Sequence, residues 1–153
     1  MPYYVHDKII SPNVWDEQWD IGSISNATGE NINGGYLRSK NLVGVIPNKT
    51  YYLKRPSDTI IWLYAYDANG NFLRSFNNGA GYIAITAGNY NFTMPSNVYY
   101  IRFLISLNYG ATYNHDICIN VSDPAINGNY YPYNLGCKRY IIKDNNNSMN
   151  IGG

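Results

Sequence analysis

Apolar and polar residues alternate along much of this chain with the period of two that is typical of β-strands. The clearest case is residues 99–107, whose alternate positions hold Tyr99, Ile101, Phe103, Ile105 and Leu107. Because successive side chains of a strand point to opposite faces of its sheet, we expect this set to form a buried face. The intervening positions, which include Arg102, then form a second face that is a candidate for ligand or subunit contacts.

Residues 60–66 alternate in the same way, with two kinds of apolar side chain. Ile61, Leu63 and Ala65 are small or aliphatic, whereas the positions between them are all aromatic: Trp62, Tyr64 and Tyr66. The segment runs into an Asn69-Gly70 pair, which is a strong signal for a hairpin turn. We therefore predict a hairpin whose second strand spans residues 72–76.

Further strands are predicted at residues 36–45, 51–54, 81–85, 90–94 and 116–121, with Pro, Asn and Gly marking the turns between them. No segment shows a helical repeat over several turns. Residues 25–35 and 123–136 are expected to be irregular. Many short strands at this spacing predict an all-β fold, namely a jelly-roll-type antiparallel β-sandwich, with a barrel as the alternative.

The length of 153 residues fits one domain with a sizeable core. We assign residues 12–136 to the sandwich and residues 1–11 to an N-terminal lead-in. Residues 137–153, rich in asparagine, are expected to form a short irregular C-terminal tail. That tail is interpreted as a linker to another domain, a frayed end, or a segment that becomes ordered only in an oligomer.

The amino-acid composition favours neutral polar ligands over nucleic acid as partners. The chain has 17 tyrosines, a charged fraction of 14% and a net charge of +1. Tyrosine is enriched in wet, specific contact surfaces, and asparagine adds uncharged donors and acceptors, so the pair suits neutral polar ligands such as sugars. The alternative is that the tyrosines pack the strands, which we expect for more than half of them. A basic stripe for nucleic acid is absent from the sequence.

The sequence predicts neither a membrane-spanning segment nor a disulfide framework. No apolar run approaches the roughly 20 residues that a membrane-spanning helix needs, and the N-terminus lacks the pattern of a secretory signal. We therefore expect synthesis in a cytoplasm and no membrane insertion. Cys118 and Cys137 match no metal-binding spacing, and we do not expect them to pair.

Seven short motifs occur in a recognisable order between residues 12 and 134. They are Trp15-Asp16-Glu17-Gln18-Trp19-Asp20-Ile21-Gly22, Arg38-Ser39-Lys40-Asn41, Pro47-Asn48-Lys49-Thr50-Tyr51-Tyr52, Tyr66-Asp67 before a turn, Met94-Pro95-Ser96-Asn97-Val98-Tyr99-Tyr100-Ile101-Arg102-Phe103, Thr112-Tyr113-Asn114-His115-Asp116-Ile117 and Tyr131-Pro132-Tyr133. Together they resemble a module of tail and fibre proteins from phages and prophages of Gram-positive hosts. The resemblance implies a β-sandwich of carbohydrate-binding-module type, located in the virion and acting in attachment to the bacterial surface. It further implies other tail proteins as partners and a homotrimer, without catalytic residues or a cofactor.

Two groups of residues are candidates for ligand binding. The first is an aromatic platform with a nearby arginine, made of Trp62, Tyr64, Tyr66 and Arg102. The second is a loop before a strand, made of Asn108, Tyr109, Tyr113, Asn114 and Asp116. Each has a structural alternative: the platform packs against a second sheet, a loop or a neighbouring subunit, and the loop forms an Asx-type turn.

Enzyme chemistry and metal binding are not expected. His115 stands beside Asp116, but neighbouring strand residues point to opposite faces, and no activated nucleophile or carboxylate pair accompanies them. Asp16 and Glu17 could contribute to a calcium site, although calcium needs about six oxygen ligands. The alternative is that Trp15 and Trp19 cover the core edge while Glu17 and Gln18 bond backbone amides or pair with Arg38.

Two functions follow as hypotheses. The first is a non-catalytic module that binds a bacterial surface glycan during host recognition. The second is a structural fibre or baseplate module, whose tyrosine-rich face is a homotrimer interface and which binds no glycan.

Overall fold

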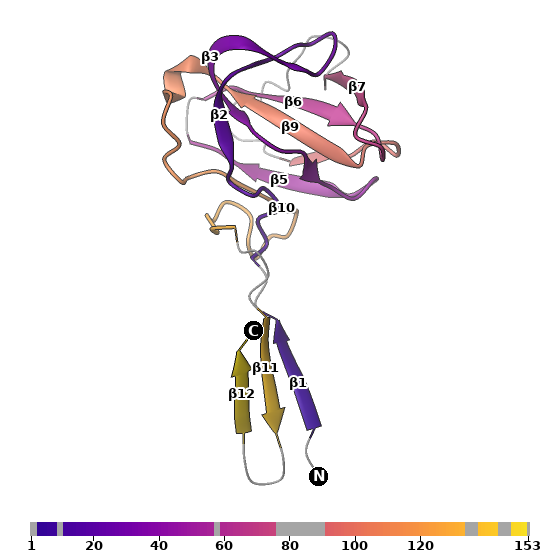
Figure 1. The fold of residues 1–153 in the computed structure, drawn as a ribbon, viewed down its shortest axis with the longest axis vertical. Coiled ribbons are helices and arrows are strands. Elements are labelled where there is room, and N and C mark those ends of the chain that lie inside the picture. Colours follow the sequence, from indigo (N-terminus) through magenta and orange to yellow (C-terminus); the bar gives the residue numbers. More distant parts are fainter. Residues whose placement is uncertain are drawn as a thin grey trace.

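A computed structural model describes residues 3–8, 11–56, 59–75, 91–133, 138–143 and 148–152. These residues form two packed antiparallel sheets and a separate three-stranded sheet, which projects from one end of the sandwich (Figure 1). The described part of the chain is almost entirely strand, turn and loop, and its one helix is a three-residue 3-10 turn, η1 (Leu107–Tyr109). The predicted all-β sandwich is therefore confirmed. No helix in the described ranges is long and apolar enough to cross a bilayer.

The larger sheet has five strands in one row and a short sixth strand beside them. Its order is β2 (Trp19–Ile24), β3 (Asn31–Ser39), β9 (Tyr100–Ile105), β6 (Ile61–Tyr66) and β7 (Phe72–Ser75), and β4 (Val43–Gly44) also pairs with β9. The strand predicted at residues 36–45 is thus wrong as a single element, because the chain leaves the ladder between β3 and β4. The expected irregular segment 25–35 is also wrong in part, since β3 begins at Asn31.

The smaller sheet consists of β10 (Cys118–Val121), β5 (Thr50–Lys54) and β8 (Asn91–Thr93), in that order. β8 and β10 fall within segments that the sequence predicts as strands, and β5 begins one residue before its predicted segment. The strand predicted at 81–85 lies outside the described residues. The irregular connection predicted after residue 123 is confirmed as far as residue 133.

The core lies between the two sheets and follows the alternation of β6 and β9. Ile61, Leu63 and Ala65 are fully buried there, as are Ile101, Phe103 and Ile105. The prediction that Tyr99 and Leu107 join this face is wrong, since they are 44% and 60% exposed. β9 runs only from Tyr100 to Ile105, so the period of two does not extend to these flanking residues.

Two local predictions concern the edges of the sandwich. Asp67 and Asn71 close the β6–β7 hairpin through a backbone hydrogen bond of 2.9 Å, and Gly70 takes a φ of 78° that favours glycine. Trp15 is fully buried with its ring centroid 4.8 Å from that of Phe103. Trp19 is half-buried and packs against the same core. The predicted hairpin and the role of the two tryptophans are therefore confirmed.

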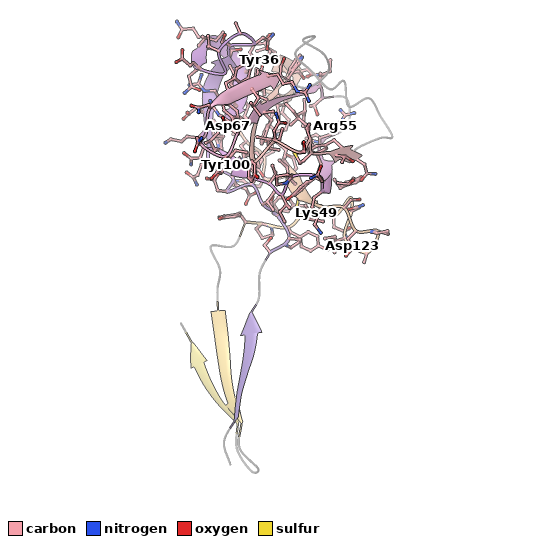
Figure 2. The ribbon with its side chains drawn as sticks, turned by 90° about the vertical axis from the view of Figure 1, so that its right-hand side faces the viewer. Tyr36, Lys49, Arg55, Asp67, Tyr100 and Asp123 are labelled. Atoms are coloured by element: carbon pink, nitrogen blue, oxygen red, sulfur yellow. The ribbon has the colours of Figure 1, made fainter. Side chains whose placement is uncertain are left out.

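Both chain ends contribute to the separate sheet. It contains β1 (Tyr3–Lys8), β11 (Lys138–Lys143) and β12 (Ser148–Gly152), with β11 in the middle. The predicted irregular C-terminal tail is therefore wrong: its backbone forms a hairpin and pairs with the N-terminal lead-in. A low apolar content predicts an irregular tail, but strand pairing satisfies the backbone whatever the side chains are. In Figure 2, Tyr36 lies at the end of the sandwich away from this sheet and Asp123 at the near end.

Candidate functional site

The outer face of the larger sheet carries a second apolar cluster, separate from the core. Its buried members are Ile24, Tyr64, Tyr66 and Leu104. Four half-buried aromatic residues pack against them, namely Tyr36, Trp62, Phe72 and Tyr100. This is the face to which strand parity assigns the predicted aromatic platform, so Trp62, Tyr64 and Tyr66 do share one side of β6.

Residues 25–30, which join β2 to β3, form a compact turn that we call the cap loop. Backbone hydrogen bonds of 2.8 Å from Ser25 to Glu30 and from Gly29 to Ser25 close it. Gly29 has a φ of 69°, and a Cβ at this position would clash with the ring of Phe72. Only glycine therefore allows the cap loop to lie this close to the sheet.

Two tyrosines of β6 hold the cap loop in place. The Tyr64 hydroxyl donates to Asn26 Oδ1 at 2.8 Å, and the Tyr66 hydroxyl donates to the Gly29 carbonyl at 2.7 Å. Burial raises the pKa of Tyr64 to about 12, and burial also raises the pKa of Tyr66 against the opposing effect of Arg102. The alternative in which the aromatic platform packs against a loop therefore holds for Tyr66, because the cap loop covers it.

Arg102 is placed by a break in the sheet. The guanidinium group donates to the Ser39 carbonyl from Nε at 3.2 Å and from Nη2 at 2.7 Å, and the residue is 7% exposed. Ser39 Oγ accepts from the Phe103 amide at 3.0 Å. These bonds lie where β3 ends before β4 begins, so Arg102 and Ser39 replace the missing ladder contacts.

A cavity of about 450 Å³ lies between the cap loop and the aromatic end of this face. It is lined by Ser23, Ile24, Ser25, Asn26, Ala27, Ile32, Tyr36, Trp62, Tyr64 and Leu104. The rings of Tyr36 and Trp62 meet edge to face, with centroids 5.7 Å apart and planes at 85°. Among the described residues that line it, none carries a charge.

Of the predicted platform, Trp62 and Tyr64 line this cavity, whereas Tyr66 and Arg102 do not contribute to the lining. Tyr36 and Asn26 are absent from the predicted site because both fall in or beside the segment predicted to be irregular. For Tyr36 a signal is present in the sequence: it alternates with Leu37, and Leu37 is a core residue. For Asn26 no local pattern indicates that it lies over Tyr64.

The predicted loop site forms a separate, internally bonded structure. The Tyr109 hydroxyl donates to Asp116 Oδ1 at 2.7 Å and accepts from the Asn114 amide at 2.7 Å. The expected Asx-type turn is thus replaced by a tyrosine bridge, and burial raises the pKa of Tyr109. The Asn108 side chain is exposed and bonds the Ser106 hydroxyl. None of this group is among the residues that line the 450 Å³ cavity.

Glu17 joins three distant parts of the chain. Its Oε1 accepts from the hydroxyls of Tyr113 at 2.6 Å and Tyr130 at 2.5 Å, and its Oε2 accepts from the Tyr133 amide at 2.8 Å. Burial, reinforced by the Glu17 carboxylate, raises the pKa of Tyr130 to about 12 and also raises the pKa of Tyr113. The prediction that Glu17 bonds a backbone amide is confirmed.

The predicted pairing of Glu17 with Arg38 is wrong. Arg38 Nη2 lies 3.9 Å from Asp20 Oδ2, and its Nη1 donates to the carbonyls of Ser23 and Ile32. Arg38 occupies the outer face opposite Leu104 of β9, which places it beside Asp20 on the neighbouring strand.

Asn13 makes a second connection near Glu17. Its Nδ2 donates to the Tyr131 carbonyl at 3.0 Å, and its Oδ1 accepts from the amides of Trp15 and Ile119. Asn13 and Glu17 therefore join the segment that enters the sandwich to the segment that leaves it. We call this pair of connections the terminal clamp.

The carboxylates considered for calcium are engaged by protein donors. Asp16 accepts from the Gln18 amide at 3.0 Å and from Asn41 Nδ2 at 2.9 Å, and Glu17 is bonded as described above. Within the described ranges, no group of three or more His, Cys, Asp or Glu residues is placed to hold a metal ion. Cys118 is a buried free thiol, and burial raises its pKa.

Comparisons of the chain with protein-family models, with curated proteins and with solved structures give no match. The site is therefore interpreted from its geometry and chemistry.

Proposed function

We propose that this chain is a non-catalytic module of a phage tail or fibre that binds a bacterial surface carbohydrate during host recognition. The observation that carries the proposal is the uncharged cavity beside Trp62 and Tyr36, where aromatic rings and a cluster of small polar side chains meet. The placement in a virion rests on the order of the sequence motifs, and a homotrimer and other tail proteins are its expected partners.

The lining of the cavity suits a sugar. The C–H face of a pyranose ring is apolar and packs on aromatic surfaces, whereas its hydroxyl edge needs hydrogen-bond partners. Trp62, Tyr36 and Leu104 provide the first kind of surface, and Ser23, Ser25 and Asn26 provide the second. A volume of about 450 Å³ falls within the range of small-molecule sites and accommodates one or two sugar rings.

The test is binding of the whole chain to Gram-positive cells and to a glycan array. Trp62→Ala removes half of the edge-to-face pair, so we expect the Kd for the best glycan to rise about tenfold, equivalent to about 1.4 kcal/mol. Tyr99→Ala is the matched control, because Tyr99 is an aromatic residue that is 44% exposed and does not line the cavity. Equal binding by wild type and Trp62→Ala would contradict the assignment of this cavity.

One observation favours the structural module as a second candidate function. The separate sheet has three strands and pairs both ends of the chain through β11. A sheet of this size gains stability when it packs against another element or subunit. A trimeric mass of the whole chain by light scattering, without binding to cells or glycans, would favour this candidate over the first.

A further inference from the structure

We infer that the cavity beneath the cap loop selects an acetamido sugar, that is, a hexosamine whose amino group is acetylated. This inference rests on the proposed function and specifies the ligand of the same site. It comes from the direction of the hydrogen bonds that surround the cavity.

Asn26 presents donors to the cavity. Its Oδ1 accepts from the Tyr64 hydroxyl at 2.8 Å, and the same hydroxyl lies 3.2 Å from the Ile24 carbonyl. The Nδ2 group, with two N–H donors, is then the free end of the side chain, and none of the described residues accepts a hydrogen bond from it. Asn26 is exposed, so this donor is open to a ligand.

The Ser25 hydroxyl is also a hydrogen-bond donor toward a ligand. Its Oγ accepts from the backbone amides of Ala27 and Thr28, each at 3.2 Å. These two bonds use the lone pairs of the hydroxyl, so its O–H remains to donate. Asn26 and Ser25, neighbours in the cap loop, therefore both offer hydrogen to a ligand oxygen.

The remainder of the lining near these donors is apolar. Ile24, Ala27, Ile32 and Leu104 line the cavity together with the rings of Tyr36 and Trp62. An acetamido group matches this arrangement, because its carbonyl oxygen is a strong acceptor with no hydrogen of its own and its methyl group is apolar. A hydroxyl at the same position of the sugar is a weaker acceptor and brings no methyl group.

Charge excludes two related ligands. A free amino sugar is cationic near neutral pH, and the described lining residues include no carboxylate to pair with it. The donors would tolerate an anion such as a phosphate or carboxylate, but no lysine or arginine lines the described part of the cavity to neutralise it. A neutral acetamido sugar is the class that both the donors and the apolar wall accept.

The experiment is calorimetry of the whole chain with three β-1,4-linked trisaccharides that differ only at C2. They are the trimer of N-acetylglucosamine, the trimer of glucosamine and the trimer of glucose. We expect the acetylated trimer to bind at least about tenfold more tightly than the other two. Trp62→Ala should weaken its binding.

The Asn26→Asp substitution tests the contribution of the Asn26 amide donors alone. The substitution keeps an oxygen to accept from Tyr64 and replaces the amide donors with a charged acceptor, so the loop should stay folded while the acetylated trimer loses at least about tenfold in affinity. Asn97→Asp, at an exposed asparagine that does not line the cavity, makes the same chemical change and should have no effect.

Every other outcome overturns the inference. If the glucose trimer binds equally well and its binding depends on Trp62, the acetamido assignment is wrong while the proposed function stands. The acetamido assignment is equally wrong if none of the trimers binds but whole cells do so through Trp62, or if Asn26→Asp changes nothing. If neither the trimers nor cells bind, the proposed function fails as well.

Discussion

The Tyr113 hydroxyl donates a 2.6 Å hydrogen bond to Glu17, a residue 96 positions earlier in the chain. Tyr130 and the backbone of Tyr133 bond the same carboxylate from the other end of the sequence. Two residues that the sequence suggests for different roles, one as a sugar ligand and one as a calcium ligand, are thus part of a single structural contact. The tyrosine-rich composition here serves the closure of the fold.

Glu17→Ala should lower the free energy of unfolding by about 3 kcal/mol, because two tyrosine hydroxyls and one amide lose a charged acceptor. Urea denaturation followed by circular dichroism measures this change. Glu30→Ala, the same substitution at an exposed glutamate in the cap loop, should cost less than about 0.5 kcal/mol. Similar losses for the two variants would contradict the role of Glu17.

Arg102→Met should destabilise the protein by about 3 kcal/mol, because the Ser39 carbonyl loses two hydrogen bonds from a buried guanidinium group. Arg74→Met is the matched control, since Arg74 is exposed on β7. At temperatures where both variants are folded, their glycan affinities should equal that of the wild type. A specific loss of binding in Arg102→Met would show that Arg102 also contacts the ligand.

Gly29→Ala should cost about 2 kcal/mol of stability and weaken glycan binding. The left-handed backbone and the contact with Phe72 leave no room for a Cβ, so the cap loop that carries Asn26 must shift. Gly44→Ala provides the control, because a Cβ at Gly44 would have no other side chain or backbone within 4 Å. Thermal unfolding measures the stability of the two variants, and calorimetry measures their glycan affinity. Unchanged glycan affinity in Gly29→Ala would contradict the role of the cap loop in binding.

Alkaline pH should weaken the fold through the buried Tyr64 and the half-buried Tyr130. The pKa of Tyr64 and that of Tyr130 are raised from 10.0 to about 12, so the folded state holds these protons more tightly than the unfolded state does. Their contribution is complete below pH 10.0 and is lost as the pH rises through about 12. Urea unfolding at a series of pH values should show this decline, and Tyr64→Phe should make it shallower. Absorbance titration of tyrosinate should show a late-ionising fraction that Tyr64→Phe reduces.

Sequence periodicity predicts the strands of the sandwich because burial imposes a period of two on them. This rule assigns Leu63 and Phe103 to the core, and both are fully buried. The rule fails just outside the strand ends, as for Tyr99 and Leu107. These residues lie beyond β9, so sheet pairing no longer directs their side chains to alternate faces.

The candidate site is predictable from the sequence only in part, because the tertiary fold brings its residues together from separate elements. Trp62 can be assigned to an outer face from its own strand, but its partner Tyr36 comes from β3, and Asn26 reaches Tyr64 from a loop 38 residues away. Arg102 is a functional candidate in the sequence because a charge interrupts an apolar strand. Its partner, the Ser39 carbonyl, is a backbone group at a break in the sheet that no side-chain pattern reveals.

The terminal clamp also determines how the module carries a mechanical load. Asn13 bonds Tyr131 and Ile119 of β10, and Glu17 bonds Tyr133, so a pull on the two segments acts first on these contacts and on β10. None of these residues is among those that line the cavity beneath the cap loop.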